Sequence, residues 1–142
     1  MRILVIDAQG GGVGKQLITA IKKELPEALV TAVGTNSTAA SAMLKAGADE
    51  AATGENSVVV CSKRADIIVG PIGIVIADSM LGEVTPKMAA AVAESGAVRI
   101  LIPFNNCDNI IAGVNELNVK TLINDAVQKI KAVCEKTEGI DK

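Results

Sequence analysis

Histidine, tryptophan and tyrosine are absent from the 142-residue chain, and phenylalanine occurs once. Without histidine, a Ser–His–Asp triad, a Cys–His pair and a His-ligated zinc site are all excluded. Any acid–base chemistry therefore depends on Asp, Glu, Lys or Cys, or on the ligand itself. The chain also lacks aromatic side chains on which bases stack, and its net charge is −2 with no basic stripe. Nucleic acid is therefore not an expected partner.

No apolar run is long enough to span a membrane. The longest near-continuous one, Ile67–Ala77, is interrupted by glycine and proline and is well short of the ~20 residues that a spanning helix needs. No signal-like apolar stretch behind a charged segment opens the sequence. We therefore expect a cytoplasmic protein without membrane contact. Its three cysteines, Cys61, Cys107 and Cys134, form no C-x-x-C motif and are expected to be reduced.

The chain is rich in aliphatic residues, and 49% of it is hydrophobic. Short apolar runs that fit strands buried on both faces alternate with stretches of helical periodicity. The runs predict strands over residues 2–6, 29–33, 49–53, 66–70, 98–102 and 109–114. The periodic stretches predict helices over residues 13–25, 35–45, 54–61, 71–81, 85–95 and 119–136, although the β-branched residues of 71–81 also fit a strand.

Alternation of strands and helices at this spacing is typical of βαβ units. The sequence therefore predicts an α/β fold, a single Rossmann-like three-layer domain over residues 1–136. Its sheet is expected to be mostly parallel, with about five or six strands. Residues 137–142 are expected to form a frayed C-terminal tail.

A glycine-rich loop, Asp7–Lys15 (DAQGGGVGK), follows the first predicted strand. In an open α/β sheet this loop borders the crevice that binds ligands, and glycines let main-chain N–H groups and a helix N-terminus approach an anion. The loop departs from the dinucleotide motif G-x-G-x-x-G, because Lys15 replaces the third glycine and no acidic residue ends the second strand. It departs from the Walker A motif because Gln9 and Gln16 replace a glycine and a Ser/Thr.

Two interpretations of this loop are open. Either the glycines serve only close packing of strand against helix, or they expose main-chain amides to a phosphate. Their number exceeds what a turn requires, which favours a phosphate-binding loop. The residues predicted to bind ligand at this edge of the sheet are Gln9, Gly10, Gly11, Gly12, Val13, Gly14, Lys15, Thr35, Asn36, Gly70 and Gly73. Lys15 also fits a solvated surface lysine, and Thr35 and Asn36 also fit caps of the following helix.

Three acidic residues near the same edge, Asp7, Asp78 and Glu83, are the candidates for acid–base catalysis. Solvated surface acids are the commoner case for Asp78 and Glu83. Asp7 lies among apolar residues and needs a partner: a main-chain N–H, Lys15 or a metal ion. Cys107 fits a small buried side chain better than a nucleophile. No second acid at a fixed spacing identifies a metal site, so none is predicted.

Several segments together resemble a small bacterial family known only as a domain of unknown function. The resemblance covers nearly the whole chain and implies a small stand-alone Rossmann-like protein. It brings no substrate, reaction or catalytic residue. The segments that carry it are Asp7–Lys15, Gly34–Asn36, Ala42–Ala48, Ala52–Asn56, Gly70–Ile74 and Ser79–Met88.

Three functions remain open at this point. The leading hypothesis is a binding protein for a nucleotide or another phosphorylated small metabolite, held by the glycine-rich loop. The second is a small enzyme that uses NAD(P) or a phosphorylated substrate, with NADP favoured because no acidic residue is placed to bind a ribose. The third is a structural or partner-binding module without a ligand. The mean hydropathy of +0.40 predicts self-association, as a homodimer.

Overall fold

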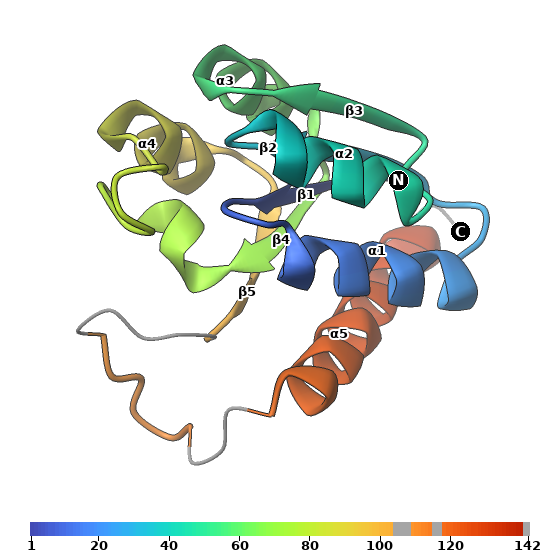
Figure 1. Ribbon diagram of the computed structural model, residues 1–142. Coiled ribbons are helices and arrows are strands. Elements are labelled where there is room, and N and C mark those ends of the chain that lie inside the picture. The colour runs from blue at the N-terminus through green and yellow to red at the C-terminus, as the bar shows by residue number, and fades with distance from the viewer. Residues whose placement is uncertain (104–108, 115–117, 141–142) are drawn as a thin grey trace.

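Residues 1–103, 109–114 and 118–140 are described in the computed structural model of the protein (Figure 1). Residues 104–108, which include Cys107, and residues 115–117 and 141–142 lie outside the described part. The strands are β1 Arg2–Asp7, β2 Leu29–Gly34, β3 Glu50–Thr53, β4 Ile67–Pro71 and β5 Val98–Ile102. The helices are α1 Gly12–Glu24, α2 Ser37–Lys45, α3 Glu55–Arg64, α4 Pro86–Glu94 and α5 Val119–Ile140, with a 3₁₀ helix, η1, at Ile72–Val75.

The five strands form one parallel sheet in the order β3-β2-β1-β4-β5. The chain runs outward from β1 to β3, crosses back to β4 and then continues to β5. The predicted Rossmann-like α/β fold with a parallel sheet is thus confirmed. Because the strand order reverses between β1 and β4, a crevice is expected beyond their carboxyl ends, at Asp7 and Pro71.

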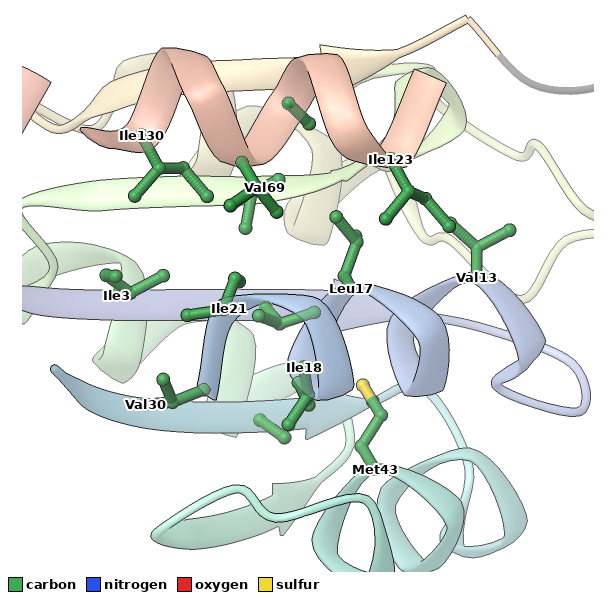
Figure 2. Close-up of a cluster of buried hydrophobic side chains, with 14 of the residues drawn as sticks. Ile3, Val13, Leu17, Ile18, Ile21, Val30, Met43, Val69, Ile123 and Ile130 are labelled. Atoms are coloured by element: carbon green, nitrogen blue, oxygen red, sulfur yellow. The ribbon is translucent and has the colours of Figure 1, made fainter. Parts of the chain in front are cut away.

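Two layers of helices cover the sheet, and alternate residues of each strand face one layer or the other. Ile3 and Val5 of β1 lie in a core with α1, α2 and α5, whereas Leu4 and Ile6 lie in a second core with α3 and α4. Figure 1 shows α3 and α4 together on one side of the sheet and α5 on the other. Figure 2 shows side chains of α1 and α5, among them Leu17 and Ile123, meeting in the first core.

Local sequence signals set the ends of several helices. Thr85 caps α4, since its hydroxyl oxygen accepts a hydrogen bond from Met88 N at 3.1 Å, and Pro86 occupies the first helical position. Gly47 follows α2 with φ +119°, the left-handed conformation expected of a glycine after a helix. These helices begin and end within about two residues of the predicted positions.

The helix predicted over residues 71–81 is wrong beyond its first turn. Only Ile72–Val75 is helical, as a 3₁₀ helix, and turns follow it. The β-branched side chains of this run disfavour an α-helix. In addition, Asp78, Met80 and Leu81 have φ of +64°, +54° and +58°, which a right-handed helix cannot contain.

The strand predicted over residues 109–114 is also wrong. Gly113 has φ +87°, and Val114 N donates to the carbonyl oxygen of Ile111 at 3.3 Å, so this segment forms a turn. Ile110 is 98% exposed and packs on no strand. A lone extended segment without a sheet partner leaves its main-chain groups unpaired, which removes the advantage of a strand.

The C-terminal helix is longer than predicted, because α5 continues to Ile140 through residues that were expected to fray. Its apolar stripe, which includes Ile123, Val127 and Ile130, anchors it on the sheet. A helix already anchored in this way adds further turns at little cost. No helix within the described residues is long and apolar enough to cross a membrane.

Replacing Thr85 with Ala tests the cap of α4. The Thr85 hydroxyl also donates to Glu55 Oε2 at 2.7 Å, so it joins α4 to the first turn of α3. We expect Thr85→Ala to lower the free energy of unfolding in urea by about 1–2 kcal/mol. Thr85→Ser keeps the hydroxyl and should stay within about 0.5 kcal/mol of the wild type. Equal losses in the two variants would show that the hydroxyl has no capping role.

Candidate ligand-binding site

A cavity of about 460 Å³ lies where the strand order reverses, beyond the carboxyl ends of β1, β4 and β5. This volume falls within the range of small-molecule sites, roughly 300–1,000 Å³. One wall is the main chain of the glycine-rich loop, and the other walls are mostly apolar. The described residues that line it are Asp7, Ala8, Gln9, Gly10, Gly11, Gly12, Val13, Gln16, Pro71, Ile72, Gly73, Ile76, Ser79, Met80, Pro103, Asn109, Ile110, Ile111, Val114 and Val119.

The structure brings some of the sequence-predicted residues to this cavity and leaves others outside it. Those that line it are Asp7, Gln9, Gly10, Gly11, Gly12, Val13 and Gly73. Lys15 instead borders a separate open depression between α1 and α2. The remaining predicted residues that are not among the lining residues are Gly14, Thr35, Asn36, Gly70, Asp78 and Glu83.

Asp7, the last residue of β1, caps the N-terminus of α1. Its side chain is only 4% exposed, and its Oδ2 accepts a hydrogen bond from Gly14 N at 2.7 Å while Oδ1 accepts one from Ala8 N at 2.8 Å. Gly11, at the N-cap position, has no side chain to do this. Burial raises the pKa of Asp7, and the hydrogen bonds from Gly14 and Ala8 only partly offset that rise. Asp7 thus finds its partner in main-chain N–H groups, one of the alternatives that the sequence left open.

Glu83 binds the outer side of the loop from a distant part of the chain. Its Oε1 accepts hydrogen bonds from Gln9 N at 2.9 Å, Thr35 Oγ1 at 2.8 Å and Asn36 Nδ2 at 2.7 Å. Burial opposes ionisation of this carboxyl group, but the three hydrogen bonds outweigh burial and lower its pKa. Glu83 is therefore an ionised group that holds the loop to the end of β2.

The four glycines of the loop fall into two pairs. A Cβ atom on Gly11 would lie 2.9 Å from Ala39 Cα, and Gly11 also has φ +74°. A Cβ atom on Gly14 would lie 2.5 Å from Met43 Sδ and 3.0 Å from Asp7 Cβ. Close approach to α2 therefore accounts for both glycines.

Gly10 and Gly12 have no such structural reason. A Cβ atom on either would meet nothing within 4 Å, and neither has a left-handed backbone. Among the hydrogen bonds of the described residues, none is donated by Gly10 N or Gly12 N, whereas Gly11 N donates to Ala8 O at 3.0 Å. Two residues that line the cavity therefore carry main-chain amides without an acceptor among the described residues.

Side-chain chemistry at the cavity is limited. No Lys or Arg is among its described lining residues, so main-chain N–H groups are the positive dipoles available to an anion there. Across the described ranges, no three Cys, Asp or Glu side chains gather as a metal site would require. Burial raises the pKa of the Cys61 and Cys134 thiols, so neither is an activated thiolate.

The apolar part of the cavity was largely missed by sequence reasoning. Ile76 and Met80 come from a segment whose pattern predicted a helix, and Ile110 and Val114 come from one predicted as a strand. Their apolar character was visible in the sequence, but a predicted helix and a predicted strand gave no sign that these side chains border a cavity. Only the placement of both turns beside β4 and β5 shows that they border a cavity.

The fold and this cavity define a small Rossmann-like α/β protein with a ligand-sized site at the switch point of its sheet. Residues 2–135 match the family described as Domain of unknown function (DUF3842), and the chain belongs to that family. No curated protein matches the sequence. Among solved structures, a dodecameric FMN-dependent Ubix-like decarboxylase from Escherichia coli O157:H7 is similar at 16% identity and a TM-score of 0.45, over 92% of this chain and 76% of that one.

The division of the glycines predicts that two neighbouring substitutions differ in their effect on the free energy of unfolding. Gly11→Ala forces a left-handed alanine against the Ala39 main chain, so we expect the free energy of unfolding to fall by about 1–3 kcal/mol. Gly10→Ala enters open space and should change it by less than about 0.5 kcal/mol. Urea denaturation of both variants measures the difference. A loss at Gly10 as large as that at Gly11 would contradict the division.

The raised pKa of Asp7 predicts a pH dependence. Between the ordinary value of 3.8 and its higher pKa in the folded protein, Asp7 is ionised in the unfolded chain and protonated in the folded one. Its contribution to stability is therefore complete below pH 3.8 and is lost as the pH rises through the folded-state pKa. Asp7→Asn should lose about 1–3 kcal/mol, because its amide cannot accept both hydrogen bonds.

Denaturation of the wild type, Asp7→Asn and Glu83→Gln from about pH 3 to pH 8 measures this effect. The advantage of the wild type over Asp7→Asn should shrink as the pH rises. Glu83→Gln is the matched control with the opposite sign: because the pKa of Glu83 is lowered, its contribution is lost as the pH falls. A constant difference between wild type and Asp7→Asn would contradict a raised pKa.

Proposed function

We propose that this protein binds a nucleotide or a similar phosphorylated small molecule in the cavity beyond β1 and β4. A phosphate oxygen of the ligand accepts hydrogen bonds from Gly10 N and Gly12 N. The observation that carries the proposal is a coincidence at these two positions: the glycines that packing does not require line the cavity, and their amides have no acceptor among the described residues. A helix N-terminus behind such amides favours an anion.

The rest of the cavity suits the apolar portion of such a ligand. Val13, Pro71, Ile72, Ile76 and Met80 offer aliphatic surface next to the loop. A flat base or ring that covers these side chains removes apolar area from water, which contributes roughly 25 cal/mol per Å². Polar main-chain groups beside an apolar wall are the usual composition of a small-molecule site.

The enzyme hypothesis has less support. Of the three acidic candidates, only Asp7 lines the cavity, and both of its carboxylate oxygens already accept main-chain hydrogen bonds. Asp78 and Glu83 are not among the lining residues. Acid–base catalysis by these groups, the homodimer and the cytoplasmic location stay predictions from the sequence.

A thermal-shift screen in which each nucleotide is paired with its dephosphorylated form tests the proposal. A ligand at 100 times its Kd stabilises the protein by about 2.7 kcal/mol. We expect at least one phosphorylated compound to stabilise the protein and its dephosphorylated partner to stabilise it less. Gly12→Val places a side chain on the cavity wall and should abolish the shift while the protein stays folded.

Gly96→Val is the matched control. Gly96 also has open space around its Cβ position and no left-handed backbone, but it lies between α4 and β5, away from the cavity. The Gly96→Val variant should show the same thermal shift with the phosphorylated compound as the wild type. Equal binding by Gly12→Val and Gly96→Val would show that the loop is not part of the site. If no phosphorylated compound stabilises the protein, the proposed function is contradicted.

A further inference from the structure

The Glu83 carboxylate occupies the donors at the carboxyl ends of β1 and β2. Its Oε1 is the shared acceptor of Gln9 N, Thr35 Oγ1 and Asn36 Nδ2, at distances of 2.7–2.9 Å. Asn36 Nδ2 donates in addition to the carbonyl oxygen of Gln9 at 2.9 Å. Asn36 Oδ1 caps α2 by accepting from Ala39 N at 2.8 Å. The polar groups that follow β2 are therefore engaged within the protein.

Two of these donors, Thr35 and Asn36, follow β2, whereas the cavity lies at the ends of β1, β4 and β5. The described lining residues come from the segments after β1, β4 and β5, and none comes from the segments after β2 or β3. A dinucleotide bound at such a sheet extends across the switch point, with the ribose of its second half beside the end of β2. In this protein that position holds the Glu83 side chain.

Glu83 is held there by an ordered turn. Within residues 76–84, Asp78 N donates to Val84 O at 2.8 Å and Gly82 N donates to Asp78 O at 3.1 Å. Ser79 Oγ donates to Gly73 O, which fastens the turn to η1. These hydrogen bonds fix the main chain around Glu83, and the turn therefore holds the carboxylate against the glycine-rich loop.

We infer that the site takes a ligand of mononucleotide size, and that Glu83 excludes the second half of a dinucleotide. The inference rests on the proposed function and narrows its ligand class. A dinucleotide would have to displace an ionised carboxylate from three hydrogen bonds, and its own negative charge would then lie beside that carboxylate. NADP, which the sequence favoured as the cofactor of an enzyme, is therefore expected to fit this site poorly.

Calorimetric titrations with matched ligands test this inference. NADP and flavin adenine dinucleotide are each compared with their mononucleotide halves. For the wild type, the best mononucleotide should bind at least as tightly as the dinucleotide that contains it. Glu83→Gln keeps an acceptor oxygen at this position but removes the charge, so it should relax that preference only in part. Glu83→Ala frees Gln9 N, Thr35 and Asn36, and should shift the ratio of dinucleotide to mononucleotide affinity by about tenfold toward the dinucleotide.

The outcomes separate the two claims. A wild type that binds a dinucleotide about tenfold more tightly than either half overturns the exclusion by Glu83 and leaves the proposed function standing. Failure of every nucleotide of either size to bind overturns the proposed function and this inference with it. The comparison of mononucleotide with dinucleotide in the wild type decides the inference even where Glu83→Ala does not fold.

Discussion

The hydrogen bond from Gly14 N to the buried Asp7 carboxylate joins β1 to α1 and organises the glycine-rich loop between them. The last residue of the central strand supplies the group that α1 lacks at its N-cap position, so strand and helix are joined without a capping side chain from the loop itself. Because no residue of the loop has to supply a capping side chain, the loop can be rich in glycine. Burying a carboxyl group for this purpose opposes its ionisation, but placing it under a helix N-terminus offsets part of that cost.

This arrangement leaves most main-chain amides of the loop bonded within the protein and a few without an acceptor in the described part of the chain. Asp7 and Glu83 together take up Ala8 N, Gln9 N and Gly14 N, and Gly11 N is bonded within the turn, so most of the amides that a phosphate would use are already satisfied. The amides that remain are Gly10 N and Gly12 N, which belong to residues that line a mostly apolar cavity. A site of this kind gains affinity from shape and apolar contact as much as from charge, since no lysine or arginine is among its described lining residues.

Most of the sheet and its helices could be predicted from the sequence, and the reasons are local. The apolar runs of β1 and β4 signal strands buried on both faces, and Thr85 before a proline signals the start of α4. The turn over residues 76–84 could not be predicted, because left-handed conformations at non-glycine residues leave no sequence signature. The bond between Gln9 N and Glu83 joins residues 74 apart, and no periodicity reveals a contact at that separation. The glycine-rich loop was visible from the start, but which of its glycines serve packing depends on Ala39 and Met43 of α2.

The central claim is that Gly10 and Gly12 present free amides while the rest of the loop is bonded internally. Amide hydrogen exchange of the ligand-free protein, resolved at single residues, tests it most directly. The account predicts slow exchange at Gly14 N, which Asp7 protects, and exchange close to that of an exposed loop at Gly10 N and Gly12 N. Protection of Gly10 and Gly12 equal to that of Gly14 would contradict it, because the protein would then already fill the place assigned to the phosphate.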